Sequence, residues 1–313
     1  MHVYRWDLDR TYLDTDIHSV RGLLRTAFES AADKRTLPGA ATLMRSLSEQ
    51  DPSSRTFVLS GSPTQMRTVL REKLALDGVK VERLTLKDNL GNLRRGRFRA
   101  VRGQVGYKLP QLLQQRVGLG PAVRETLFGD DSEVDALVYA TYAAAISRRI
   151  DEATLTRVME TGGAYADAIN SAIEALHRVG IADAVEDIFI HLDQGTPPAR
   201  FAKLGSRVVP VFSWFLAALV LYSRGRLEPA GVGRVARSCA SEAGLDDMAL
   251  AGLAQDAVRR RLLTAEALRQ LVDSHESLSP LRGAVLRALD YLGSAPDIPD
   301  DQLDLVGWLR ENR

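Results

Sequence analysis

Two patterns of apolar residues alternate along the first half of the chain. Short apolar runs of the kind that form buried strands occupy residues 3–8, 57–60, 79–86 and 126–129. Segments with apolar residues at helical spacing lie between or after them, at residues 20–28, 40–47, 64–74 and 109–113. This alternation is typical of a parallel sheet with helices on both faces, whose ligands bind beyond the carboxyl ends of the strands. We therefore expect an α/β, Rossmann-like fold.

The second half of the chain shows helical periodicity throughout. Apolar residues recur at helical spacing at residues 169–176, 208–222, 248–263, 267–272 and 281–292. Breaks containing proline fall at residues 195–198, 228–231 and 294–296. The pattern predicts two domains, an α/β domain of residues 1–150 and an all-α domain of residues 151–313.

One apolar stretch, residues 208–222, raises the question of a membrane segment. It is shorter than the ~20 residues that cross a bilayer, and it contains Pro210 near its start. The pattern therefore predicts a helix buried in the core and no transmembrane segment. Peripheral association of this stretch with a lipid surface is the alternative.

Candidate chemistry begins where the first apolar run ends. Asp7 and Asp9 follow directly, and Thr11 comes two residues later. Residues two apart in a strand point the same way, so the two carboxylates are expected to project together from the end of the strand. Carboxylates held so close repel each other, and a divalent cation relieves the repulsion. A set of oxygen ligands suits Mg²⁺, so the pair predicts a Mg²⁺ site.

Three later segments place polar residues at comparable positions, near the end of a strand or the start of a helix. In chain order these are Ser60 and Gly61 after the second strand, Lys108 before a helix, and Asp130, Asp131 and Asp135 after a further strand.

Each of these residues also has a structural interpretation. Ser60 could cap the helix that follows it, and Lys108 could be a solvated lysine before a helix. The acidic residues at positions 130, 131 and 135 could place negative charge at the N-terminus of the next helix, where the helix dipole favours it. Thr11 could simply end its strand. The order of the four segments along the chain favours the catalytic interpretation.

The ordered set resembles the four motifs of the haloacid dehalogenase (HAD) superfamily of phosphohydrolases. Within that superfamily it is most similar to the phosphatidate phosphatase catalytic domain of the actin-patch type, which is distantly related to lipins. The similarity covers residues 1–150. The residues that carry it are Asp7, Asp9 and Thr11, then Ser60, Ser62, Pro63 and Gln65, then Tyr107, Lys108 and Leu109, and finally Gly129, Asp130, Asp131, Asp135 and Tyr139.

Two residues depart from the pattern of this family. Arg10 stands where the family usually has Asp, and Gly61 stands where it has Asn. Neither change removes a reacting group. Both residues lie where a substrate head group would pass, so they bear on the choice between lipid and soluble substrates.

The resemblance and the chemistry of phosphoryl transfer imply the same roles. Asp7 is the nucleophile that forms an aspartyl-phosphate, because a carboxylate is ionised at neutral pH without help from a base. Asp9 is the general acid and base. The expected substrate-binding residues are Thr11, Ser60, Gly61 and Lys108. The expected metal-site residues are Asp7, Asp9 through its backbone carbonyl, Asp130, Asp131 and Asp135, the last two as holders of Mg²⁺ waters or of Lys108.

Composition narrows the class of protein. The 313-residue chain has a formal net charge of +1, which argues against a nucleic-acid partner. Its single cysteine, Cys239, excludes an internal disulfide and a cysteine metal site. The first motif begins too close to Met1 for a signal peptide, so the expected location is the cytoplasm. His177, His191 and His275 are scattered and predict no metal cluster.

Arginine is concentrated in residues 94–102, where five arginines are interleaved with other residues. The structural interpretation is a solvated loop that leads to Lys108. The functional interpretation is an electropositive lip that attracts phosphorylated or anionic lipid substrates.

The sequence therefore predicts a Mg²⁺-dependent phosphatase that hydrolyses a phosphomonoester through an aspartyl-phosphate. The expected substrate is phosphatidate, a related lipid phosphate or a phosphorylated small molecule. The alternative is a non-catalytic phosphate-binding or scaffold protein whose helical domain docks a partner. Residues 151–313 are compatible with three roles: a platform for a homo-oligomer, a lid over the site, or a docking module.

Overall fold

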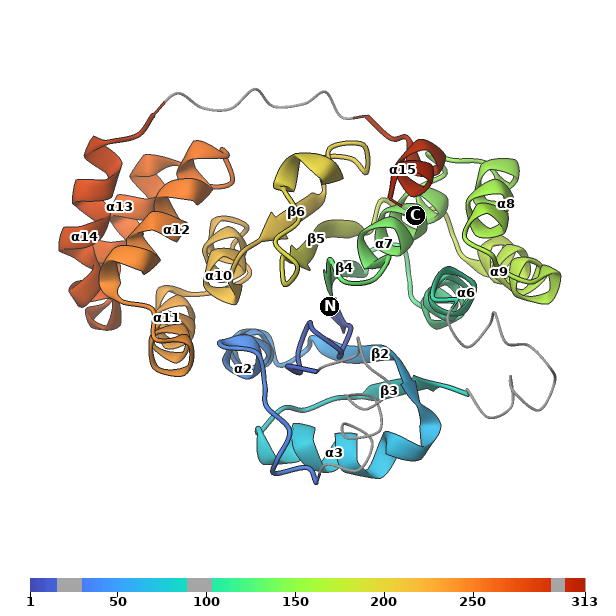
Figure 1. Cartoon of the computed structure of the whole chain (residues 1–313), viewed down its shortest axis with the longest axis horizontal. Helices are drawn as coiled ribbons and strands as arrows, with labels where there is room; N and C mark the ends of the chain where they lie inside the picture. Colours follow the sequence, from blue (N-terminus) through green and yellow to red (C-terminus); the bar gives the residue numbers. More distant parts are fainter. Residues whose placement is uncertain (16–29, 89–102, 294–301, 313) are drawn as a thin grey trace.

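The structure is a computed structural model that describes residues 1–15, 30–88, 103–293 and 302–312 (Figure 1). The helix expected at residues 20–28 and the arginines of residues 94–102 lie outside the described residues. No helix in the described ranges is both long and apolar enough to cross a membrane.

A sheet of six parallel strands forms the centre of the fold. Its order is β3-β2-β1-β4-β5-β6. The strands are β1 (His2–Trp6), β2 (Arg55–Pro63), β3 (Arg83–Lys87), β4 (Arg124–Asp130), β5 (Val185–His191) and β6 (Val208–Val211). The chain builds outward in one direction from β1 to β3 and in the other from β4 to β6. The strand order therefore reverses between β1 and β4, which is where ligands bind in sheets of this kind.

Helices cover both faces of the sheet, as predicted. One face packs on α2 (Ala40–Gln50), α3 (Arg67–Leu76), α10 (Trp214–Ser223) and the helices that follow, namely α11 (Pro229–Ala243), α12 (Asp247–Arg259), α13 (Ala265–Ser274) and α14 (Ser279–Asp290). The other face packs on α6 (Val105–Arg116), α7 (Asp135–Ile146), α8 (Glu152–Thr161), α9 (Ala166–Arg178) and α15 (Leu305–Glu311). Figure 1 shows α12–α14 gathered at one end of the molecule and α8 and α9 at the other.

Successive residues of each central strand pack alternately into the two hydrophobic cores, one on each face of the sheet. In β4, Phe128 belongs to the core under α10, whereas Leu127 belongs to the core under α7. In β5, Phe189 belongs to the core under α10 and Ile188 to the core under α7. This alternation follows from the pleat of a strand and leaves both faces of the sheet buried.

The expectation that residues 151–313 are helical throughout is wrong for two segments. Strands β5 and β6 lie in this half of the chain and extend the sheet beyond β4. A strand buried on both faces reads as a continuous apolar run, and periodicity alone does not separate such a run from a buried helix. The sheet therefore crosses the boundary expected at residue 150. After β6 the described residues form helices and connecting turns, apart from one isolated bridge between Leu303 and Leu204.

The apolar stretch of residues 208–222 divides into two elements. Its first four residues form β6, an edge strand, which explains why Pro210 is tolerated there. Helix α10 then begins after Ser213, whose hydroxyl accepts a hydrogen bond from the Phe215 N–H at 3.2 Å. Its residues from Trp214 to Leu221 are buried, so the predicted core helix is confirmed for this part.

Candidate active site

The candidate site lies at the carboxyl ends of β1, β2 and β4. Asp7 directly follows β1, Ser60 lies within β2 and Asp130 ends β4. The Asp7 N–H donates to the Phe128 carbonyl at 2.9 Å, so the end of β1 remains paired with β4. Adjacent parallel strands thus bring the first and fourth predicted motifs together where the strand order reverses.

Three carboxylates form a buried cluster at this point. Asp7, Asp130 and Asp135 each contribute one oxygen to a group whose members all lie within 4.8 Å of one another. One oxygen of Asp7 and one of Asp135, both Oδ2, are buried without a hydrogen-bond partner among the described residues. Oxygen donors of this kind fit a hard divalent cation such as Mg²⁺, which would satisfy acceptors that the protein leaves unpaired.

Gly129 makes the close packing of this cluster possible. A Cβ at residue 129 would lie 2.7 Å from Asp135 Cβ and 2.8 Å from the Tyr139 ring. Any side chain at this position would push α7 away from the end of β4. The glycine before Asp130 therefore allows the first residue of α7 to reach the cluster.

Lys108 is the positive centre of the cluster. Its fully buried ammonium donates to Asp7 Oδ1 at 2.8 Å, to Glu133 Oε2 at 3.1 Å and to Asp135 Oδ1. These three acceptors use all three donors of the ammonium group. Burial alone lowers the Lys108 pKa, but the carboxylates of Asp135, Asp7 and Glu133 outweigh burial and hold that pKa well above its ordinary value. Lys108 lies inside α6, which begins at Val105, rather than before the helix as expected.

The carboxylates outnumber this single cation, and their pKa values show the imbalance. Burial raises the pKa of Asp7 well above its ordinary value, and the neighbouring charges of Asp135, Glu133 and Asp130 add to the rise against the opposing effect of Lys108. Burial, with the charges of Asp135 and Glu133, raises the pKa of Asp130 to about 8. Burial also raises the pKa of Asp135 to about 6. A bound cation would act in the opposite direction, because it favours the ionised form of each of these carboxyl groups.

Asp9 turns away from this cluster toward β2. Its Oδ2 accepts hydrogen bonds from the hydroxyls of Ser60 at 3.1 Å and Ser62 at 2.7 Å. Strand β1 ends at Trp6, and the chain then turns, with the N–H groups of Tyr12 and Leu13 donating to the Leu8 carbonyl. The strand alternation that was expected to align the Asp7 and Asp9 side chains therefore does not apply.

Three other predicted residues contact the site in specific ways. The Thr11 hydroxyl donates to Asp130 Oδ2 at 3.1 Å, so Thr11 helps to orient the Asp130 carboxylate within the cluster. A Cβ at Gly61 would lie 2.5 Å from Gln104 Nε2, so the glycine allows Gln104 to approach β2. The Asp131 carboxylate accepts from the N–H groups of Gln194 at 2.8 Å and Thr196 at 3.0 Å and faces the loop after β5.

The structure thus unites part of the predicted metal set. Asp7, Asp130 and Asp135 come together with Lys108, whereas the side chains of Asp9 and Asp131 are outside the group of possible metal ligands in the described ranges.

Sequence reasoning assigned no role to three residues of the site. Glu133 accepts from Lys108 and, through Oε1, from Gln104 Nε2 at 2.8 Å. Ser62 binds Asp9 more closely than Ser60 does. The acidic run 130–135 and the Ser-Gly-Ser triplet 60–62 gave a signal for Glu133 and Ser62. Gln104 has no such signal, because its role depends on the approach of α6 to β2.

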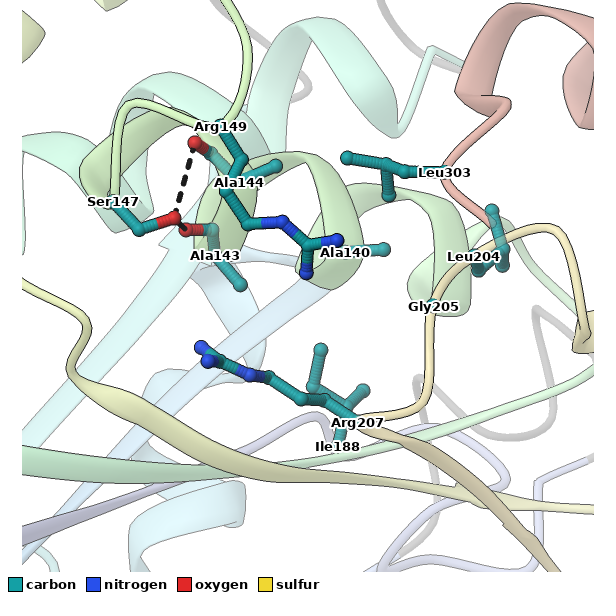
Figure 2. Close-up of a pocket in the computed structure, with 10 residues that line it drawn as sticks. All are labelled: Ala140, Ala143, Ala144, Ser147, Arg149, Ile188, Leu204, Gly205, Arg207 and Leu303. Carbon is teal, nitrogen blue, oxygen red and sulfur yellow. Dashed lines mark hydrogen bonds between the residues drawn. The ribbon is translucent and has the colours of Figure 1, made fainter. Parts of the chain in front are cut away.

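A small cavity lies elsewhere, between α7, β5 and the segment before β6. It has a volume of about 20 Å³, and Arg149 and Arg207 extend along its walls among small apolar side chains (Figure 2). That volume holds about one water molecule. The cavity contains none of the predicted site residues, so it does not compete with the acidic cluster as the candidate active site.

Comparison with known proteins addresses the first half of the chain. Residues 6–156 match the family described as the catalytic domain of phosphatidate phosphatase APP1. No match was found among curated proteins or among solved structures. The matched segment contains the carboxylate cluster, Lys108 and both serines of β2. Residues 6–156 are therefore similar to the catalytic domain of phosphatidate phosphatase APP1.

Proposed function

We propose that the protein is a Mg²⁺-dependent phosphatase of the HAD type that hydrolyses a phosphomonoester through an aspartyl-phosphate. The observation that carries this proposal is the buried meeting of Asp7, Asp130, Asp135 and Lys108 at the point where the strand order reverses. A cation held by the three carboxylates would neutralise phosphoryl oxygens during transfer. The match of residues 6–156 to a phosphatase catalytic domain supports the same reaction class.

Asp7 acts as the nucleophile. Its carboxylate attacks phosphorus, the bond from phosphorus to the leaving oxygen breaks, and an aspartyl-phosphate forms. Lys108, 2.8 Å from Asp7 Oδ1, fixes the orientation of this carboxylate and opposes the negative charge that gathers around it. Burial of the lysine makes this interaction stronger than it would be in water.

Asp9 acts as the proton carrier. In the first step it gives its proton to the leaving oxygen, which departs as an alcohol. In the second step it takes a proton from the water that attacks the aspartyl-phosphate, and inorganic phosphate and free Asp7 are released. Ser60 and Ser62 hold the Asp9 carboxylate at 3.1 and 2.7 Å, beside β2 and outside the group of three carboxylates.

The family match favours phosphatidate or a related lipid phosphate as the substrate. A lipid phosphate and a soluble phosphomonoester present the same phosphoryl group to Asp7. They differ in the leaving alcohol, so measured activity on both kinds of substrate distinguishes them.

The test is phosphate release with Mg²⁺ from a short-chain phosphatidate and from p-nitrophenyl phosphate. Asp7→Asn keeps the shape of the side chain but removes the nucleophile, so we expect it to lower kcat by about a thousandfold or more on both substrates. Acid-quenched wild-type protein should also carry a covalent phosphate that the variant lacks.

Asp14→Asn is the matched control. Asp14 is an exposed carboxylate on the same segment, and its replacement should leave kcat unchanged. Equal activity of wild-type protein and Asp7→Asn would exclude Asp7 as the nucleophile. Absence of any Mg²⁺-dependent phosphate release would favour the alternative of a non-catalytic phosphate-binding protein.

A further inference from the structure

The loop after β5 is fastened to both acidic motifs of the site. On one side, the Asp131 carboxylate accepts from the N–H groups of Gln194 and Thr196, and the Asp131 N–H donates to the His191 carbonyl at 3.1 Å. Asp131 is the residue directly after Asp130 of the cluster. The loop, residues 192–196, is thus held rigidly against the end of β4.

On the other side, the loop holds the residue directly after Asp9. Asp193 forms an ion pair with the Arg10 guanidinium, and the same Asp193 oxygen, Oδ2, accepts from Gln194 Nε2 at 2.7 Å. The Arg10 and Asp193 side chains are 12% and 22% exposed, so the pair is largely shielded from solvent. Ion pairs with this degree of burial fix geometry better than exposed ones do.

The Arg10 backbone requires such support. Its φ is 57°, a left-handed conformation that is unfavourable for a residue other than glycine. This conformation reverses the chain immediately after Asp9, and the Arg10 N–H closes the turn by donating to the Leu13 carbonyl at 2.8 Å. Strained residues of this kind persist where surrounding contacts determine them, and they cluster at functional sites.

A second contact from the later part of the chain supports the same turn. Trp214 Nε1 donates to the Thr11 carbonyl at 3.1 Å, and the His191 ring stacks on Trp214 with centroids 5.3 Å apart. The turn of residues 9–11 is therefore held by Asp193 and by Trp214, both outside residues 6–156.

We propose that Asp193 is a positioning residue for the phosphatase reaction, which acts through Arg10 to keep the Asp9 carboxylate where it meets the leaving oxygen. This inference rests on the proposed function, in which Asp9 protonates that oxygen. The serines of β2 hold the Asp9 side chain, and Asp193 holds the backbone from which that side chain extends. The segment beyond the matched family domain is thus part of the catalytic apparatus.

The proposal predicts a loss of activity whose size depends on the leaving group of the substrate. An alkoxide leaves poorly and depends strongly on a proton from Asp9, whereas p-nitrophenolate leaves readily without one. Misplacement of Asp9 should therefore impair hydrolysis of an alkyl phosphate more than hydrolysis of an aryl phosphate. A general loss of folded protein would reduce both activities equally.

The experiment measures kcat/KM of Asp193→Asn on glycerol 3-phosphate or a short-chain phosphatidate, whichever the wild-type protein hydrolyses, and on p-nitrophenyl phosphate. We expect a loss of about tenfold on the alkyl phosphate and less than about threefold on the aryl phosphate. Asp193→Glu, which restores the charge, should recover most of the alkyl activity. The control is Glu186→Gln, which breaks the ion pair with Arg226 at the other end of β5 and should leave the ratio of activities unchanged.

Equal losses on the two substrates, or no loss on the alkyl phosphate, would overturn the positioning role of Asp193 while leaving the phosphatase assignment intact. A wild-type protein without phosphatase activity would instead overturn the proposed function itself.

Discussion

At the scale of single residues, the site is dominated by an excess of buried negative charge. Asp7, Asp130, Asp135 and Glu133 surround one lysine, and burial raises the pKa of the three aspartates. A buried carboxylate without a compensating charge destabilises the folded protein. The arrangement is therefore costly in the protein alone and becomes favourable when a divalent cation is bound, because binding adds to the free energy of unfolding.

Asp130→Asn distinguishes the destabilisation caused by the buried carboxylates from the stabilisation caused by a bound cation. Burial opposes the ionisation of Asp130, which ionises freely in the unfolded chain, and asparagine does not ionise in either state. The unfolding temperature without metal should therefore rise by about 2 °C or more in the variant. In the wild-type protein, saturating Mg²⁺ should raise the unfolding temperature by about 5 °C, and in the variant this rise should vanish. Thermal unfolding followed by circular dichroism, with EDTA or with Mg²⁺, measures both changes.

Asp131→Asn is the control for this prediction, since its carboxylate binds the loop after β5 and lies outside the cluster. It should retain the full response to Mg²⁺. A response of Asp130→Asn equal to that of wild type would rule out Asp130 as a metal ligand.

The sequence predicted much of this site because its key residues follow strands. Asp7 follows β1, Asp130 ends β4, and Ser60 lies in the last part of β2 between them and the sheet edge formed by β3. Parallel pairing brings the carboxyl ends of neighbouring strands to one edge of the sheet. The position of Asp9 could not be read in the same way, because it depends on where β1 stops and on the left-handed turn at Arg10. The partnership of Arg10 with Asp193 joins residues 183 positions apart, so no local pattern indicates it.

At the scale of elements, the limits of sequence reasoning appear most clearly in β5. Its centre, Ile188 to Ile190, is apolar on both faces because α10 covers one face and α7 the other. The period of two that identifies a half-exposed strand is therefore missing. In contrast, α10 was recognisable as buried because its apolar run extends all round the helix.

The start of β1 makes stability depend on pH. His2 is buried, and its Nε2 lies 2.9 Å from the Thr126 hydroxyl of β4. Burial, assisted by the Arg226 charge, lowers the His2 pKa to about 4, although Glu186, Glu125 and Asp51 oppose the shift. Between pH 6.5 and 4 the unfolded chain binds the His2 proton and the folded protein does not. The free energy of unfolding is therefore highest above pH 6.5 and falls as pH decreases, by about 3 kcal/mol at most from this residue.

His2→Gln tests this dependence, since glutamine does not titrate. Urea unfolding at pH 7.5 and pH 5 should show a decrease in the free energy of unfolding that is about 2 kcal/mol smaller in the variant than in wild type. His177→Gln, which alters an exposed histidine paired with Glu152, should keep the wild-type decrease. An unaltered pH dependence in His2→Gln would show that other groups cause the loss.

At the scale of the whole molecule, the matched family domain does not contain a complete core. Trp6 and Phe128 stack with centroids 3.9 Å apart, and Trp214 of α10 packs against both rings. Strand β4 ends the sheet within residues 6–156, yet in the full chain it pairs with β5. At the far end of the chain, α15 returns to pack on α7 and α8, and Trp308 Nε1 donates to the Arg200 carbonyl at 2.7 Å. The second half of the chain therefore completes both faces and one edge of the sheet.

A chain shortened to residues 1–156 should consequently fail to fold by itself. Loss of β5 and α10 would expose the edge of β4 together with the aromatic side chains of Trp6 and Phe128, and such an edge promotes aggregation. We expect the shortened chain to show no cooperative thermal unfolding and poor dispersion of amide signals in NMR spectra. The control, residues 1–293, retains all six strands and loses only the segment that contains α15, so it should unfold cooperatively at a lower temperature than the full chain. Cooperative unfolding of residues 1–156 at the wild-type temperature would mean that β5 and α10 contribute nothing to the core, contrary to the packing of Trp214 on Trp6.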